Sequence, residues 1–542
     1  MDIGLISLIL VLGLIFLLGI GMPLGFASAV LALLVMVMKF EPSLLLNPLS
    51  FGEGLLTGRP GTGPLYILTQ KIFDLMTEYV LISVPLFIFM AALLERSGVA
   101  KQMYDSLDYW LSGVRGGIAI VTSLMAVIMA AMSGIIGGEV VLLGLIALPQ
   151  MLRLGYNQNL AIGTICASGS LGTMIPPSIV LIIYGLITET SIKALFTGAF
   201  IPGAMLASFI IIYIVVRTQL NPTLAPLPEK REGDPGGREK ALMFSSFVSL
   251  IIAGLTSLFL LRNLFLTVTG RNNPAQEDFE PLFLGMVSDL PYLIGVIALC
   301  YVISFHGFGK ERTKIAWKHG KGLVAPLSVI GVVLGSIYGG VTGITEAAGM
   351  GALAVFIIAA FRGEASVGLL WDSLMRTLRS TGTIIWVTVG AAALSGAYTL
   401  AGGPTYIAEL IIAAEMPTML VLLTMMLILL FMGAFMDWVG IVLLIIPVFL
   451  PIVKRLPIEE IGFIGTLSPS QISIWFGVLF CMNMQVSFLS PPFGPAAFYL
   501  KSVAPAHISL TDIFRGFLPF IGVQLLALSV LLIWPSIVTI LL

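Results

Sequence analysis

Apolar runs of about twenty residues recur along the whole chain, and each is long enough to cross a lipid bilayer as a helix. Hydrophobic residues make up 58% of the 542 positions and charged residues only 10%, whereas a soluble domain carries about a quarter charged residues. The chain is therefore predicted to be an all-α polytopic protein surrounded by membrane lipid. The predicted crossings lie near residues 4–20, 24–39, 79–95, 117–132, 133–151, 158–189, 195–216, 241–261, 284–305, 322–339, 346–361, 381–399, 417–433, 434–453, 472–500 and 513–541.

Two of these apolar stretches are interrupted by a pair of prolines. The first contains "CASGSLGTMIPPS" and the second "CMNMQVSFLSPPF", and in each the cysteine stands ten positions before the first proline. Proline lacks a backbone N–H and bends a helix, so carbonyl groups upstream lose their partners. Inside a bilayer such groups must be satisfied by a cavity, a neighbouring helix or a bound ion. We therefore predict two functional helix breaks, at Pro176, Pro177, Pro491 and Pro492.

The stretches that precede the two breaks also correspond. One reads "SGIIGGEVVLLGLIALPQM", in which Glu139 precedes Pro149 by ten positions. The other reads "GAFMDWVGIVLLIIPVFLP", in which Asp437 precedes Pro447 by ten. Two pairs of anchors in the same order, within matching series of crossings, predict an internal repeat. The predicted organisation is a first repeat, an insertion with two further spans and a second repeat, at residues 1–217, 218–321 and 322–542.

The positive charges predict how the chain is oriented. We take about 117–151 and about 417–453 to be re-entrant hairpins, each entering and leaving on one face. With the N-terminus outside, most of the 27 Lys and Arg residues then fall on the cytoplasmic side. Both termini are predicted to be periplasmic, the first hairpin opens to the cytoplasm and the second to the outside. The repeats are thus inverted, and inverted repeats with broken helices near the bilayer midplane are typical of secondary transporters.

The residues beside the breaks suit the binding of a cation and of an anionic substrate. Carbonyl groups freed by a break are ligands for Na⁺, and the N-termini of half-helices favour anionic substrates. Small or polar side chains occupy both sites: Ser168, Gly169, Ser170, Gly172, Thr173, Asn483, Gln485, Ser487 and Ser490. Glu139 and Asp437 are intramembrane acids, for which a functional role and a capping role at the hairpin tip both remain open.

Six motifs in one order resemble a known family: "PLFIFMAALLERSG", "SGIIGGEVVLLGLIALPQM", "SGSLGTMIPPS", "GGVTGITEAAG", "FMDWVGIVLLIIPVFLP" and "SFLSPPFGPAAFYL". They are similar to the large permease subunit of TRAP (tripartite ATP-independent periplasmic) transporters, the DctM family. The resemblance covers 1–217 and 322–542. It implies an elevator-type secondary transporter of the ion-transporter fold in the bacterial inner membrane, which imports organic anions such as C4-dicarboxylates or 2-oxo acids by Na⁺ symport. The implied partners are a small four-helix membrane subunit and a periplasmic solute-binding protein.

The resemblance also implies the sites, because family Na⁺ sites lie where hairpin tips meet broken helices. By motif they fall on Ser133, Gly134, Gly169, Gly172, Thr173, Gly433, Asp437, Ser487 and Ser490. The substrate would bind between the hairpin tips, and we assign the other polar residues beside the breaks to it: Ser168, Ser170, Asn483 and Gln485. The first hairpin departs from the family pattern of small residues and an Asp, since Ile135, Ile136 and Glu139 follow its Ser-Gly. The insertion is also absent from the usual large subunit.

Other classes of protein are weighed against this interpretation. A stand-alone carboxylate carrier of the same fold, without a binding protein, remains an alternative. An intramembrane enzyme is a remote one, because the sequence has no HExxH motif, no GxGD in a span and no clustered His or Cys. The three cysteines and three histidines give no zinc spacing. We therefore expect no catalytic residue, no cofactor other than Na⁺ as coupling ion, no transition metal and, without a large basic patch, no nucleic-acid partner.

Overall fold

A computed structural model describes residues 2–46, 63–111, 113–134, 136–227, 235–268, 290–413, 416–492 and 494–542. Within these ranges the chain folds into helices joined by short connections. Nine of the described helices are long and apolar enough to cross a membrane. The predicted all-α polytopic class is therefore confirmed. The predicted span near 284–305 lies partly outside the described residues.

The first part of the chain follows the predicted crossings closely. Its long helices are α1 (Ile3–Gly19), α2 (Leu24–Phe40), α6 (Ser83–Arg96), α8 (Gly117–Ser133), α9 (Ile136–Arg153), α10 (Gln158–Gly169), α11 (Ile179–Thr188) and α12 (Ile192–Leu220). Hydropathy gave no sign of three shorter helices, α3 (Ser43–Leu46), α5 (Pro64–Thr77) and α7 (Val99–Leu111). Helix α7 is amphipathic, because its buried residues recur at helical spacing.

The remaining helices comprise those of the predicted insertion and a second series. The former are α13 (Gly237–Val268), α14 (Leu290–Val302) and α15 (Lys310–Gly320). The second series is α16 (Val324–Tyr338), α17 (Ile344–Phe361), α18 (Val367–Leu400), α19 (Gly403–Ala413), α20 (Thr418–Gly433), α21 (Trp438–Leu444), α22 (Ile446–Val453), α23 (Ile472–Leu489), α24 (Pro495–Lys501) and α25 (Leu510–Ile533). The second hairpin is thus less regular than expected, since its returning arm is interrupted at Ile445 between α21 and α22.

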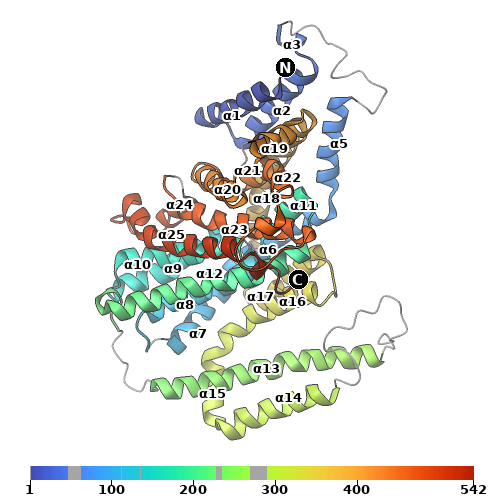
Figure 1. Ribbon diagram of the computed structural model, residues 1–542. Coiled ribbons are helices and arrows are strands. Elements are labelled where there is room, and N and C mark those ends of the chain that lie inside the picture. The colour runs from blue at the N-terminus through green and yellow to red at the C-terminus, as the bar shows by residue number, and fades with distance from the viewer. Residues whose placement is uncertain are drawn as a thin grey trace.

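The two hairpins and the two broken helices lie together in the middle of the molecule (Figure 1). Helices α8 and α9 pack on each other and on α10, while α20 packs on α23. The two series also interlock, because α10 packs along α25 and α9 packs along α24. These helices include the most deeply buried span of the protein, Pro469–Leu489. A hairpin beside each broken helix is the arrangement expected of the predicted inverted-repeat transporter fold.

A second set of helices surrounds this centre. Helix α2 packs along α18, and α6 packs on α17 and α18. The closest approach is at Gly25 and Gly390, where a methyl group on Gly390 would overlap the Gly25 carbonyl. Small residues at such a crossing let two membrane helices pack backbone to backbone. Helices α2, α6, α17 and α18 are thus packed on one another beside the hairpins.

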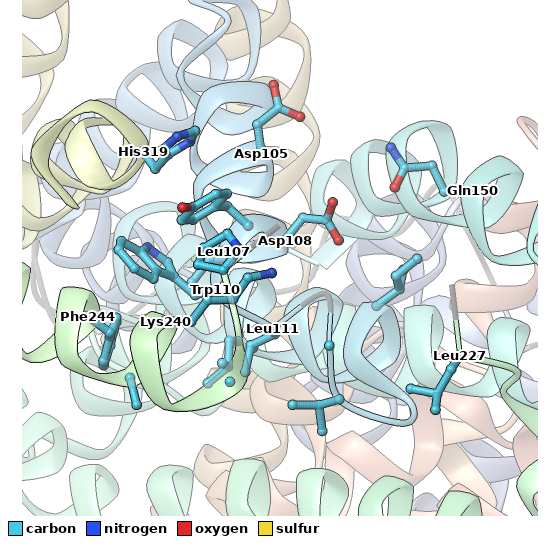
Figure 2. Close-up of a pocket in the computed structure, with 18 of the residues that line it drawn as sticks. Asp105, Leu107, Asp108, Trp110, Leu111, Gln150, Leu227, Lys240, Phe244 and His319 are labelled. Carbon is cyan, nitrogen blue, oxygen red and sulfur yellow. The ribbon is translucent and has the colours of Figure 1, made fainter. Parts of the chain in front are cut away.

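Helices α13 and α14 lie at one end of the molecule and meet the rest mainly through α7 and α15 (Figure 1). The contact is aromatic. The Tyr109 and His319 rings stack with centroids 3.7 Å apart and planes 3° apart, and Lys240 lies 5.3 Å from the Tyr109 ring centroid. Trp110 packs on Phe247 with ring centroids 6.3 Å apart. Figure 2 shows His319, Trp110 and Lys240 side by side among the residues that line a pocket between α7, α9 and α13.

Replacing Phe247 with alanine is expected to loosen this contact. The ring is buried between Trp110 and Trp317 and leaves no room for a side chain at Gly320. Truncating a buried phenylalanine costs about 3–5 kcal/mol, so the melting temperature of the purified protein in detergent should fall. Phe259→Ala on the exposed face of the same helix is the matched control. An equal fall in both variants would contradict the assignment.

Candidate functional site

The first helix break begins before its prolines. Helix α10 ends at Gly169, residues Ser170–Thr173 form a 3-10 turn, and α11 starts only at Ile179. The peptide bond between Pro176 and Pro177 is cis. One freed carbonyl is satisfied locally, because the Ser178 hydroxyl donates to the Thr173 oxygen at 2.5 Å. The break thus leaves a buried turn of small and polar residues facing the helices that pack against it.

The tip of the first hairpin packs on this break. Gly134 ends α8 in the left-handed region, with a φ of 61°, and a methyl group there would lie 2.5 Å from the Pro177 carbonyl oxygen. A side chain at Gly169 would meet Val140 of α9 at 2.7 Å. Glycine is therefore required at both positions for the backbone to approach this closely. The structure thus places Gly134 and Gly169, both predicted at the first Na⁺ site, in the contact between the first hairpin and the first broken helix.

Glu139 reaches from α9 into the same contact. Its side chain is only 1% exposed, and one carboxylate oxygen accepts a hydrogen bond from the Ser133 hydroxyl. A methyl group at Gly172 would lie 2.9 Å and 3.1 Å from the two carboxylate oxygens. The second oxygen, Oε2, has no hydrogen-bond donor among the described residues. A buried carboxylate needs a partner, because removing an unpaired charge from water is very costly.

A glutamine from the second repeat completes this cluster. Gln485 of α23 is fully buried, and its Nε2 donates to the hydroxyl of Thr173 in the 3-10 turn. Its carbonyl oxygen, Oε1, also lacks a donor among the described residues. Two buried oxygens without donors, Glu139 Oε2 and Gln485 Oε1, therefore flank the turn at Gly172–Thr173. Oxygen ligands of this kind are the ones that hard cations prefer.

The second break resembles the first in its packing but is more open. Helix α23 ends at Leu489 and α24 begins at Pro495, with a cis bond between Pro491 and Pro492. Gly433 at the end of α20 lies so close to Ser487 that a methyl group there would overlap its side chain. Both prolines of the second pair are exposed, whereas both prolines of the first pair are buried.

The other predicted residues have different surroundings. Asn483 donates from Nδ2 to the Met426 carbonyl of α20 at 2.8 Å, and Ser490 donates to the Val486 carbonyl at 2.8 Å. Asp437 precedes α21 in the second hairpin and is exposed. These side chains lie at the second hairpin, and Asn483 still has an unpartnered buried oxygen among the described residues.

Two predicted substrate residues are turned toward other helices. The Ser168 hydroxyl pairs with Ser123 of α8 at 2.8 Å. The Ser170 hydroxyl donates to the Ala167 carbonyl at 2.8 Å and accepts from Gln524 of α25 at 3.2 Å. The structure therefore does not bring Ser168 or Ser170 to the space between the hairpin tips. Their assignment to the substrate stays a prediction without geometric support.

Sequence reasoning missed Gln524. It is fully buried in α25 next to the first break. The available signal was a lone glutamine in the apolar stretch "LPFIGVQLLALS", since polar residues inside membrane helices are rare and usually face the protein interior.

Comparisons with known proteins identify the family. A family model described as the DctM component of the tripartite ATP-independent periplasmic transporters matches residues 9–537. The chain is 24% identical to the C4-dicarboxylate TRAP transporter large permease protein DctM of Pseudomonas aeruginosa, over 87% of this chain and 88% of that protein. It is 23% identical to the isethionate TRAP transporter permease protein DctMQ of Oleidesulfovibrio alaskensis, over 97% of this chain and 69% of that protein.

A solved structure shares the fold. The YdaH transporter of Alcanivorax borkumensis aligns with a TM-score of 0.50 and 16% identity, over 93% of this chain and 97% of that chain. At this level of identity the similarity concerns the fold alone.

Proposed function

The chain belongs to the DctM component family of the tripartite ATP-independent periplasmic transporters, and from this premise we propose that it imports an organic acid by Na⁺ symport and an elevator movement. It is the large, multi-pass permease subunit of a secondary transporter for organic acids and not an enzyme. The finer proposal names the coupling ion, the substrate class and the movement.

The observation that carries the Na⁺ proposal is the pair of unpartnered oxygens at the first break. Glu139 Oε2 and Gln485 Oε1 are buried without donors among the described residues, and they flank a turn whose carbonyl groups were freed by the break. A bound Na⁺ would supply the missing positive partner to both oxygens at once. Ser133 and Thr173 contribute hydroxyl oxygens within the same contact. The ligand set would thus join a hairpin and both broken helices.

The second break supports a site that opens and closes. Asp437, Pro491 and Pro492 are exposed, and the proposal is that a cation and an anion reach this side from the space between the hairpins. An organic acid is the proposed substrate, and C4-dicarboxylates or 2-oxo acids are its proposed classes. The two permeases reported above are named for a C4-dicarboxylate and for isethionate, which are both organic anions.

The proposed movement uses the central helices as a transport domain and the surrounding helices as a scaffold. In this structure the two meet at Gly138 of α9. An ion pair between Glu95 of α6 and Arg376 of α18 lies against Gly138, with no room for a methyl group. A second ion pair, Arg96 to Asp372 at 2.6 Å, lies beside it. An elevator movement would have to carry Gly138 away from this contact.

The proposed partners are a small four-helix membrane subunit and a periplasmic solute-binding protein that delivers the acid. The proposed location is the bacterial inner membrane, with both termini in the periplasm. The family name supports a system of three components with a periplasmic part.

Reconstituted uptake tests the proposal. Proteoliposomes containing this chain, its small subunit and its binding protein would be offered labelled succinate, pyruvate and gluconate, with and without an inward Na⁺ gradient. A tenfold gradient supplies about 1.4 kcal/mol per ion, so uptake should rise above equilibrium only when Na⁺ is higher outside. Uptake that ignores Na⁺ would refute the coupling ion. Uptake that persists without the binding protein would instead favour the stand-alone carrier.

A further inference from the structure

Tyr499 packs on the first hairpin. It belongs to α24, the helix that follows the second break, and its ring packs on Gly137 of the first hairpin. A methyl group at Gly137 would lie 3.0 Å from Cζ, 3.1 Å from Cε1 and 3.4 Å from Cε2 of the ring. The hydroxyl end of the ring therefore covers Gly137, where α9 has no side chain to intervene.

The same contact joins the two repeats. Tyr499 follows the second break, and its helix α24 packs along α9 of the first hairpin. Tyr499 thus connects the second broken helix with a glycine near the tip of the first hairpin. The substrate is proposed to bind beside this contact, between the hairpin tips.

The Tyr499 hydroxyl is available to a ligand. The side chain is 40% exposed, and its hydroxyl takes part in none of the hydrogen bonds between described residues. The neighbouring Phe498 is 46% exposed, and Pro491 and Pro492 are exposed as well. A phenol that is fixed at its ring and free at its hydroxyl is a positioned hydrogen-bond donor.

We propose that Tyr499 contacts the substrate and helps to determine which acids are carried. Its hydroxyl donates a hydrogen bond to a carboxylate oxygen of the organic acid, which is a charge-assisted bond and stronger than a neutral one. A cation held beside Asp437 offsets the negative charge that would otherwise repel the acid. Gly137 has a positioning role, because a methyl group there would lie 3.0 Å from the ring and would push it aside. This inference rests on the proposed function and adds a residue that the motifs did not indicate.

A purely structural role predicts a different outcome. If Tyr499 only fills the space over Gly137, its ring matters and its hydroxyl does not. Tyr499→Phe separates the two roles, because it removes the hydroxyl and keeps the ring. Tyr398→Phe is the matched control, since that hydroxyl pairs with Ser7 at 2.8 Å between α18 and α1. Gly137→Ala tests the positioning role by pushing the ring aside.

The experiment measures uptake kinetics in the reconstituted system with succinate, pyruvate and gluconate. In Tyr499→Phe the KM for the transported acid should rise roughly tenfold, the loss typical of a hydrogen bond to a charged group. The maximal rate and the Na⁺ concentration for half-maximal uptake should stay within about twofold, because the first cation site is not touched. Gly137→Ala should raise the KM as well, and Tyr398→Phe should leave it unchanged.

Two results would overturn the inference and they are distinguishable. Normal kinetics in Tyr499→Phe together with lost uptake in Tyr499→Ala would show that the ring only packs. Absence of Na⁺-driven uptake of any of the three acids by the unmodified chain would refute the proposed function, and this inference with it. An increased KM in Tyr499→Phe for one acid of the panel and not for the others would support a role in selectivity.

Discussion

Replacing Glu139 with glutamine is expected to raise the Na⁺ concentration needed for half-maximal uptake by roughly 100-fold. The glutamine keeps the shape of the side chain and removes its charge. Breaking a buried charge pair costs about 3 kcal/mol or more, and each 1.4 kcal/mol is tenfold in affinity. Uptake at a fixed low Na⁺ concentration would therefore be almost lost, and a high Na⁺ concentration would restore part of it.

Glu346→Gln provides the matched control for this variant. Glu346 is also an acid at the end of a membrane helix. It lies in the first turn of α17, among the helices outside the hairpins, and accepts a hydrogen bond from the Tyr79 hydroxyl at 2.9 Å. Its replacement should leave the Na⁺ dependence within about twofold, because it removes no proposed ion ligand. An unchanged Na⁺ dependence in Glu139→Gln would contradict the first site.

Thermal stability gives the same prediction a readout that does not depend on transport. A ligand that binds only the folded protein at 100 times its dissociation constant stabilises the fold by about 2.7 kcal/mol. Na⁺ should therefore raise the melting temperature of the unmodified protein. It should have a much smaller effect on Glu139→Gln. Without Na⁺, Glu139→Gln should be at least as stable as the unmodified protein, because it no longer buries an unpaired charge.

Replacing Gly433 at the tip of the second hairpin with alanine is expected to abolish uptake. The added methyl group would overlap the Ser487 side chain, so α20 must move away from α23. Overpacking of this kind costs about 1–3 kcal/mol, and it would displace the hairpin tip from the broken helix. The melting temperature in detergent should fall, and uptake should fall more than stability does.

A second-site variant distinguishes a local clash from a general effect of the substitution. Gly433→Ala combined with Ser487→Gly removes the overlapping atoms and should recover a substantial part of the melting temperature lost in Gly433→Ala. Melting temperature is the readout here, because Ser487 is itself a predicted Na⁺ ligand. Gly331→Ala on α16 is the control, because a methyl group there has nothing within 4 Å, and alanine is the better helix former. Failure of the double variant to recover, with Gly331→Ala unaffected, would mean that the contact with Ser487 is not what the glycine provides.

The structure shows an asymmetry between the two breaks. At the first, Gly134 sits on Pro177 and both prolines are buried. At the second, both prolines and Asp437 are exposed. A transporter with one closed and one open site can bind its ligands in order, since the open site admits ligands while the closed one already holds the hairpin and the helix together.

Local patterns in the sequence determined much of this protein. The apolar runs predicted the helices, because a span needs only its own length and composition to cross a bilayer. Each Pro-Pro pair predicted a helix break, because proline acts on the backbone next to it. The matching spacings from Glu139 to Pro149 and from Asp437 to Pro447 predicted which segments correspond in the two repeats. The first break nevertheless begins at Gly169, upstream of its prolines, because the 3-10 turn tightens the end of the helix.

Only the tertiary structure decided which polar groups meet. Gln485 and Thr173 are 312 positions apart and form a hydrogen bond, and Gln524 reaches Ser170 across 354 positions. The sequence analysis assigned Ser168 and Ser170 to the substrate together with Gln485. Their hydroxyls instead pair with side chains of α8 and α25. Tyr499 and Gly137 gave no sequence signal of their contact. Periodicity and spacing specify the path of a single helix, whereas the partner of a buried side chain depends on how distant helices pack.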